Sequence, residues 1–413
     1  MNLSLMISKR LRLKPEGKGR RQSPGVTIAV TGIAVAVLVM ILTLAVVSGF
    51  QNQVRHKVMG FDSQITVKKY TTNSSESPFF SFNDSISGVM RSVLPEGAVL
   101  SRCISATTLL KTDEDYIGLQ LVSDDETLNG YISEYLVDTG DSILPDEKSI
   151  AISQITATRL NLCRGDRIYA HFFVDGNVKT RRLTVSAVYD TSFGERDKRI
   201  AFCDSRLLRS VYDLDASDVE KIHISGLQFS EIESLAEDLQ QVFVAEYYSG
   251  GVGEVYQVES VLRTGAAYFG WLDLLDTNVV VIIILMTVVA AFTLVSSLFI
   301  LVLERVRMIG VLKALGATNG MVSRIFVYLA MRIMAYGLLI GNVSGLLLIW
   351  VQWQFRVLPL DPEAYYLSYV PVEFNFIPWI LLNVGAFLVA WLVLILPAMV
   401  VSRISPATTI RYE

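Results

Sequence analysis

Residues 277–303 read TNVVVIIILMTVVAAFTLVSSLFILVL, an apolar run without a single Asp, Glu, Lys or Arg. A helix of this length is long enough to cross the roughly 30 Å hydrocarbon core of a bilayer. Because no water is present there to satisfy backbone polar groups, such a run is expected to fold as a transmembrane helix. This stretch therefore predicts a membrane protein and argues against a soluble enzyme.

Three further stretches, residues 22–54, 333–355 and 374–402, are also free of charged side chains. The 413-residue chain is 52% hydrophobic, with a mean hydropathy of +0.44, which is more apolar than an ordinary soluble enzyme of this length. The additional apolar residues are concentrated in these four stretches. The stretch at residues 22–54 resembles a secretory signal, but its apolar core is longer than the roughly 7–15 residues of a signal sequence, and no obvious cleavage site follows it. We therefore expect four membrane helices, the first retained as an anchor.

Basic residues predict the orientation, because Lys and Arg in short loops stay on the cytoplasmic side. The N-terminal segment carries seven of them, and Arg305, Arg307, Lys313 and Arg324 lie between the second and third stretches in chain order. The loop between the third and fourth carries only Arg356, against Asp361, Glu363 and Glu373. Both termini are therefore expected in the cytoplasm, with the long segment after the first helix outside.

The predicted fold class is an α+β membrane protein: four transmembrane helices with a large α+β periplasmic domain inserted between helices 1 and 2. The expected boundaries are an N-terminal cytoplasmic or interfacial segment 1–21, helix 1 at 22–50, a periplasmic domain 51–272, helix 2 at 273–303, a cytoplasmic loop 304–321, helix 3 at 322–355, a periplasmic loop 356–374, helix 4 at 375–402 and a cytoplasmic tail 403–413.

The external domain shows both strand and helix patterns. Residues 182–189 alternate polar and apolar side chains, as a strand with one buried face does. Ser230 to Glu233 has the form of a capping box, followed by apolar residues at helical spacing, namely Ile232, Leu235, Leu239 and Val242. Asp124-Asp125-Glu126 is expected to be a surface loop without chemistry. The domain is therefore predicted to contain amphipathic helices packed on a sheet.

Residues typical of a catalytic or metal centre are scarce. The three histidines, His56, His171 and His223, do not lie at a metal-ligand spacing from another His or Cys, and no G-x-S-x-G elbow is present. We therefore expect no catalytic residues and no metal, and a membrane-anchored enzyme is disfavoured.

The three cysteines all fall in the external domain, at positions 103, 163 and 203. They are consistent with buried small apolar residues or with one disulfide in an oxidising compartment, and both alternatives stay open. An odd count leaves at least one cysteine outside any disulfide within the chain.

No G-x-x-x-x-G-K-[ST] phosphate-binding loop occurs anywhere in the chain. If the protein uses ATP, a separate subunit must bind it, and no cofactor is expected on this chain. The net charge of −4 and the lack of a basic patch interleaved with aromatic residues give no support to nucleic-acid binding.

The segment ERVRMIGVLKALGAT, residues 304–318, directly follows the second apolar stretch. Its apolar residues recur at helical spacing, which fits either a short surface helix or a turn whose basic residues only fix topology. The pattern E-R-x-x-x-I-G-V-L-K-A-L-G-A resembles the cytoplasmic loop of FtsX/MacB-type ABC permeases, although Met308 stands where that family often has an acidic residue. The resemblance implies a coupling helix that docks on an ATPase subunit holding ATP and Mg. The residues implied are Glu304, Arg305, Ile309, Gly310, Val311, Leu312, Lys313, Leu315, Gly316 and Ala317.

Three other segments are similar to the lipoprotein-releasing permeases of the Lol system. They are VVSGFQ at residues 46–51, LDPEAYYLSYVPV at 360–372, and the ending built from PA at 397–398, RISPA at 403–407 and RYE at 411–413. This resemblance implies a bacterial inner membrane protein in an ABC-type complex with an ATPase, a second permease subunit that is identical or related, a lipoprotein substrate and a periplasmic carrier. A MacB-like efflux permease and an FtsX-like regulator of cell-wall hydrolysis are the alternatives.

Two sets of membrane residues complete the expectations. The outer parts of helices 1 and 2 are aliphatic, as the wall of a lipid-substrate cavity should be. Ordinary lipid-facing surface has the same composition. The candidate cavity residues are Val46, Val47, Phe50, Val280 and Ile283. In helix 3, Gly337, Gly341 and Gly345 recur every four residues, which predicts a flat face for close helix packing.

Overall fold

The computed structural model describes residues 24–393, except 74–75, 113–114, 125, 127–129, 138–144, 175 and 366. The predictions for residues 1–21, for helix 4 beyond residue 393 and for the tail 403–413 lie outside this range. The chain divides into two compact units. The first contains the chain up to Gln51, Leu272–Leu358 and the chain from Val370; the second contains Asn52–Trp271 and Pro359–Tyr369.

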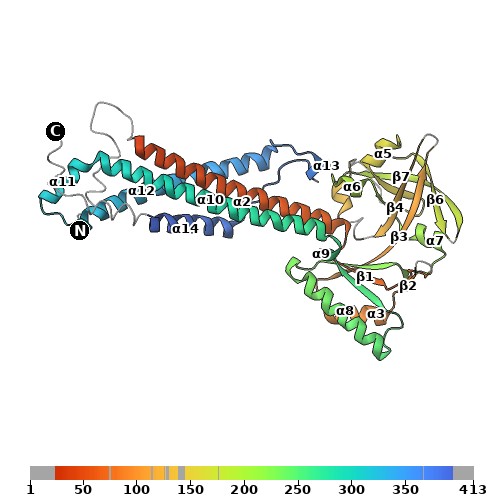
Figure 1. Ribbon diagram of the computed structural model, residues 1–413. Coiled ribbons are helices and arrows are strands. Elements are labelled where there is room, and N and C mark those ends of the chain that lie inside the picture. The colour runs from red at the N-terminus through yellow and green to blue at the C-terminus, as the bar shows by residue number, and fades with distance from the viewer. Residues whose placement is uncertain are drawn as a thin grey trace. The chain divides into compact units, whose positions relative to one another are not determined.

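The first unit is a bundle of long helices that lie side by side (Figure 1). They are α2 (Pro24–Phe61), α10 (Ala266–Glu304), α12 (Asn319–Phe355) and α14 (Phe376–Val393), with the short α11 (Val306–Ala314) between α10 and α12. Four helices among the described residues are long and apolar enough to cross a membrane. Their shared core contains buried side chains from all four, including Ile33, Leu294, Leu329 and Ala390.

The second unit is built on a nine-stranded sheet. In chain order its strands are β1 (Ile65–Lys69), β3 (Val99–Lys111), β4 (Tyr116–Asp124), β5 (Ser149–Ser153), β6 (Arg167–Val174), β7 (Asn177–Tyr189), β8 (Ile200–Cys203), β10 (Lys221–Ser225) and β11 (Tyr256–Ser260). The spatial order is β11-β1-β10-β3-β4-β8-β5-β7-β6, and β6 also pairs with β3. The six strands from β3 to β6 therefore close into a barrel, and β10, β1 and β11 extend from it as a branch.

Strand β3 is 13 residues long and belongs both to the barrel and to the branch. Its first half, Val99–Cys103, pairs with β10, and its last residues, from Thr108, pair with β6. Apolar side chains from all six barrel strands fill the barrel interior. The alternation predicted for residues 182–189 is confirmed, because Leu183, Val185, Ala187 and Tyr189 in β7 are buried.

The other elements of the second unit are short helices, turns and strands, and several of them lie against the sheet (Figure 1). They are β2 (Phe80–Ser81), α3 (Asp84–Val93), the 3-10 turn Ile132–Tyr135, α5 (Gln154–Arg159), α6 (Gly194–Asp197), α7 (Ser205–Tyr212), β9 (Asp218–Val219), the 3-10 turn Phe229–Glu231, α8 (Ile232–Ser249), α9 (Val261–Thr264) and α13 (Pro362–Tyr365).

Two local predictions in this unit were wrong. Ser230 does not cap α8, which begins after Glu231 without a side-chain cap. The Glu233 carboxylate instead accepts hydrogen bonds from Ser260 and Arg263, whose proximity the local sequence does not reveal. Asp124 is not in a surface loop: it ends β4, is 2% exposed and is hydrogen-bonded to strands distant in sequence.

Candidate functional site

Helix α11 follows α10 directly and ends in a glycine-dependent turn. Gly316 has a φ of +91°, and its N–H donates to the Lys313 carbonyl, while the Ala317 N–H donates to the Leu312 carbonyl. These two bonds form a Schellman motif, which needs a left-handed residue after the helix. The Thr318 hydroxyl then accepts from the Met321 N–H and starts α12. The sequence L-G-A-T therefore encodes a tight connection between two helices.

The residues of α11 are divided between a packed face and an open face. Ile309 is fully buried and Gly310 is also buried against the helix bundle. Val311 and Leu315 are 53% and 81% exposed, and Arg307 and Ala314 are exposed beside them. Positions 307, 311, 314 and 315 lie on one side of a helix. The open face of α11, made by Arg307, Val311, Ala314 and Leu315, is therefore partly apolar.

The ten coupling residues predicted from the sequence differ in how far they are exposed. Ile309 and Gly310 are buried, and Arg305, Leu312, Lys313 and Ala317 are half-buried. The exposed members are Glu304, Val311, Leu315 and Gly316. Arg307 and Ala314 belong to the open face but were missed, because the sequence repeat alone does not show which side of the helix packs on the bundle.

We expect Gly316→Val to loosen the α11–α12 turn. A β-branched residue in the left-handed region costs on the order of 1–3 kcal/mol, so the Schellman motif should open. Limited trypsin digestion should cleave after Lys313 faster in this variant than in the wild type. Gly320→Val is the matched control, because Gly320 has an ordinary helical φ and no atom lies within 4 Å of an added Cβ. Equal cleavage of the two variants would contradict this account.

The three glycines of α12 lie against α2. A Cβ at Gly337 would approach Ile33 Cγ2 to 2.7 Å, and one at Gly341 would approach the Ala34 carbonyl oxygen to 2.7 Å. At Gly345 the nearest atom, on Ile41, would lie at 3.3 Å. The two helices are therefore in close contact along this face, and the contact is tightest at Gly337 and Gly341.

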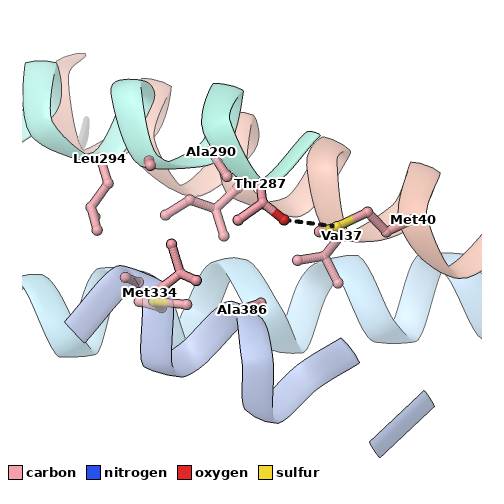
Figure 2. Close-up of a pocket in the computed structure, with 11 residues that line it drawn as sticks. Val37, Met40, Thr287, Ala290, Leu294, Met334 and Ala386 are labelled. Carbon is pink, nitrogen blue, oxygen red and sulfur yellow. Dashed lines mark hydrogen bonds between the residues drawn. The ribbon is translucent and has the colours of Figure 1, made fainter. Parts of the chain in front are cut away.

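A small cavity of about 20 Å³ lies where α2, α10, α12 and α14 meet (Figure 2). Val37, Leu294, Met334 and Ala386 point into it, and the Thr287 hydroxyl, the only polar group labelled there, donates to the Met40 sulfur at 3.7 Å (Figure 2). A volume of this size has room for about one water molecule. It is therefore far too small for an acyl chain.

The candidate lipid-cavity residues differ in how far they are exposed. Phe50 is buried, Val46, Val47 and Ile283 are half-buried, and Val280 is 55% exposed. Exposed apolar side chains continue along α10, at Val281, Ile284, Leu285, Val288 and Phe292. This row forms an open apolar face of α10 that is available to lipid or to another protein.

The VVSGFQ element has a clear structural explanation. A Cβ at Gly49 would lie 2.9 Å from the Pro371 carbonyl carbon, so only glycine fits beside that backbone. The buried Gln51 amide donates to Asp276 Oδ1 at 2.8 Å and to the Leu272 carbonyl at 3.3 Å, which ties α2 to α10. Nearby, the Glu373 N–H donates to the Ala45 carbonyl at 2.9 Å. Two of the three segments that resemble Lol permeases therefore touch each other in the first unit.

Comparison with known proteins gives a consistent result. Residues 280–406 match the FtsX-like permease C-terminal family. The chain is 24% identical over 403 residues to the lipoprotein-releasing system transmembrane protein LolC of Xylella fastidiosa (strain Temecula1), covering 93% of each protein. It is 22% identical over 407 residues to LolC of Neisseria meningitidis serogroup B, covering 94% of each. A 144-residue match to LolE of Haemophilus influenzae is 25% identical and covers 33% of this chain and 35% of that protein.

Solved structures with similar portions include the periplasmic region of MacB from Actinobacillus actinomycetemcomitans, with a TM-score of 0.33, 11% identity, and coverage of 52% of this chain and 95% of that one. The extracellular domain of the transporter YknZ from Gram-positive bacteria gives a TM-score of 0.31 and 16% identity, covering 47% of this chain and all of that one. The sequence relatives confirm the resemblance to FtsX-like and Lol permeases.

Proposed function

We propose that this chain is the permease subunit of an ABC-type complex that extracts lipoproteins from the inner membrane and passes them to a periplasmic carrier. The observation that carries the proposal is the similarity to LolC proteins over 93% of both chains, which includes the membrane helices and the external domain. A match over nearly the whole chain favours the function of the LolC proteins over that of permeases that resemble this chain only in the membrane helices.

The ATPase of this complex is a separate subunit, which holds ATP and Mg. The chain contains no phosphate-binding loop of the Walker type. The open face of α11, with Val311 and Leu315, supplies a small apolar surface suited to docking such a partner. Because α11 is held to α12 by the Schellman turn, a push on α11 is transmitted to α12, whose glycines pack closely against α2.

The energy requirement explains why a partner must hydrolyse ATP. Removing an acyl chain from a bilayer costs about 0.8 kcal/mol per CH₂, so one long chain costs on the order of 10 kcal/mol. The internal cavity of about 20 Å³ cannot take such a chain. We therefore place the lipid moiety against the open apolar face of α10, between this chain and a second permease subunit, with both termini in the cytoplasm.

A release assay tests this function. The chain, its ATPase and its second permease subunit, if different, are reconstituted in liposomes with a triacylated lipoprotein, and a soluble carrier is added outside. We expect ATP to move lipoprotein to the soluble fraction, and an ATPase variant without hydrolysis to leave it in the membrane. ATP turnover without any release would overturn the proposal and favour the efflux or regulatory alternatives.

A further inference from the structure

A buried polar cluster lies in the second unit, where the β10 branch leaves the barrel. It consists of Cys103 from β3, Asp124 from β4 and His223 from β10, and one ligand atom of each lies within 4.8 Å of the others. The Cys103 and Asp124 residues are each 2% exposed, and the His223 side chain is 13% exposed. Among the described residues, this is the one group of three His, Cys, Asp or Glu side chains found at metal-binding distances.

The sheet register brings these residues together. Cys103 is directly opposite Asp124 on one neighbouring strand, and Ser101 is directly opposite His223 on the other. Directly opposed residues, and residues two apart on one strand, point to the same face of a sheet. Cys103, Asp124 and His223 therefore share one face, although Asp124 and His223 are 99 residues apart in sequence. Rigid strands hold all three, which favours a preorganised site.

The Asp124 carboxylate is held in place by its neighbours. Its Oδ1 accepts a hydrogen bond of 2.7 Å from the Ser101 hydroxyl, and its Oδ2 lies 2.5 Å from His223 Nδ1. Hydrogen bonds that orient a ligating carboxylate are a usual part of metal sites. The arrangement thus supplies one carboxylate, one imidazole and one thiol, with the carboxylate already oriented.

The electrostatic environment favours a cation at this point. The Cys103 thiol and the Asp124 carboxylate both adjoin the His223 imidazole, so two groups that can carry negative charge lie beside one ring. Lys221 also lies near Cys103, and its ammonium group is paired with Glu220 at 2.9 Å. Two groups that are anionic when they bind a metal, a thiolate and a carboxylate, therefore face one point, and Glu220 offsets the charge of Lys221 beside them.

The donor set selects the kind of metal. Ca²⁺ and Mg²⁺ prefer oxygen ligands only, whereas thiolate and imidazole ligands suit Zn²⁺. Tetrahedral Zn²⁺ has bonds of about 2.0–2.3 Å, which place its ligand atoms about 3–4 Å apart, so the three side chains need only small movements.

We propose that Cys103, Asp124 and His223 bind one Zn²⁺, with water as a fourth ligand, as a structural clip between β3, β4 and β10. The clip would fix the branch strands to the barrel at Cys103, which is the last residue of β3 that pairs with β10 and the first that pairs with β4. Its burial favours a structural role over catalysis, and the proposal does not depend on the function proposed above.

Cobalt binding tests this site on the full chain in detergent. All proteins carry Cys163→Ser, which removes the exposed cysteine and is the matched control background. After chelator treatment, Co²⁺ is titrated and the thiolate-to-cobalt charge-transfer band is recorded, followed by displacement with Zn²⁺. We expect one Co²⁺ per chain, loss of the charge-transfer band in Cys103→Ser, and at least tenfold weaker binding in His223→Gln. Cys203→Ser should keep the band.

Two outcomes would overturn the proposal. The first is no stoichiometric Co²⁺ or Zn²⁺ on the folded Cys163→Ser protein, and the second is an unchanged band in Cys103→Ser. If Cys103→Ser does not fold, X-ray absorption of the Zn²⁺-loaded Cys163→Ser protein decides: one sulfur with nitrogen or oxygen neighbours is expected, and a shell without sulfur refutes the site.

Discussion

Replacing both Val311 and Leu315 by aspartate is expected to reduce the affinity of this permease for its ATPase at least about 100-fold and to abolish ATP-driven release. The two side chains are 53% and 81% exposed on the open face of α11. Apolar anchors buried at an interface each contribute on the order of 2 kcal/mol or more, and a buried unpaired charge adds a further penalty. Co-purification with the ATPase and titration of the complex measure the loss.

The matched control for this double variant is Val357→Asp, in the loop between α12 and α14. Val357 is 59% exposed, so it tests whether an added charge on an exposed apolar residue harms folding or membrane insertion. Val357→Asp should keep the ATPase bound. Gly310 is a poorer test position because it is buried, and its replacement would disturb packing as well as docking. Normal ATPase affinity in the Val311/Leu315 variant would refute the docking surface.

The second large effect is expected from Gly341→Leu, which should prevent stable packing of α12 on α2. Its Cβ alone would lie 2.7 Å from the Ala34 carbonyl oxygen and 2.8 Å from Val37 Cβ. Overpacking by single methylenes already costs about 1–3 kcal/mol, and a backbone carbonyl cannot rotate away as a side chain can. We expect a leucine here to cost more than about 3 kcal/mol, seen as aggregation or a strongly lowered melting temperature in detergent.

Gly385→Leu provides the comparison. Gly385 lies in the membrane helix α14, and no atom outside its own helical surroundings lies within 4 Å of an added Cβ. This variant should stay monodisperse and melt close to the wild type, because its new side chain enters open space. Similar melting temperatures for Gly341→Leu and Gly385→Leu would show that the α2–α12 contact does not require glycine.

Much of the first unit could be predicted from local sequence because its signals are local. A charge-free run such as residues 277–303 satisfies its backbone in a bilayer by forming a helix, and the structure has a long apolar helix there, α10. The L-G-A-T connection is also local, since one glycine in the left-handed region and one hydroxyl cap end one helix and start the next.

The second unit shows where local reasoning fails. Glu233 has the sequence spacing of a capping-box residue, but its carboxylate accepts hydrogen bonds from Ser260 and Arg263 instead. The fold brings these two residues next to it. Asp124 looks like a polar loop residue beside Asp125 and Glu126, yet it is buried because β4 extends through it to pair with β3. In both cases a partner distant in sequence decides the role of the side chain.

The sequence by itself determined that this protein contains long helices suited to a membrane, because a charge-free apolar run is a property of one short segment and can satisfy its backbone in a bilayer by forming a helix. Only the tertiary structure decided which face of α11 is open, since a helical repeat shows that a helix has two faces but not which one packs. Only the strand register brought Cys103, Asp124 and His223 together, because pairing between strands is set by the packing of the whole sheet and not by the spacing of residues along the chain.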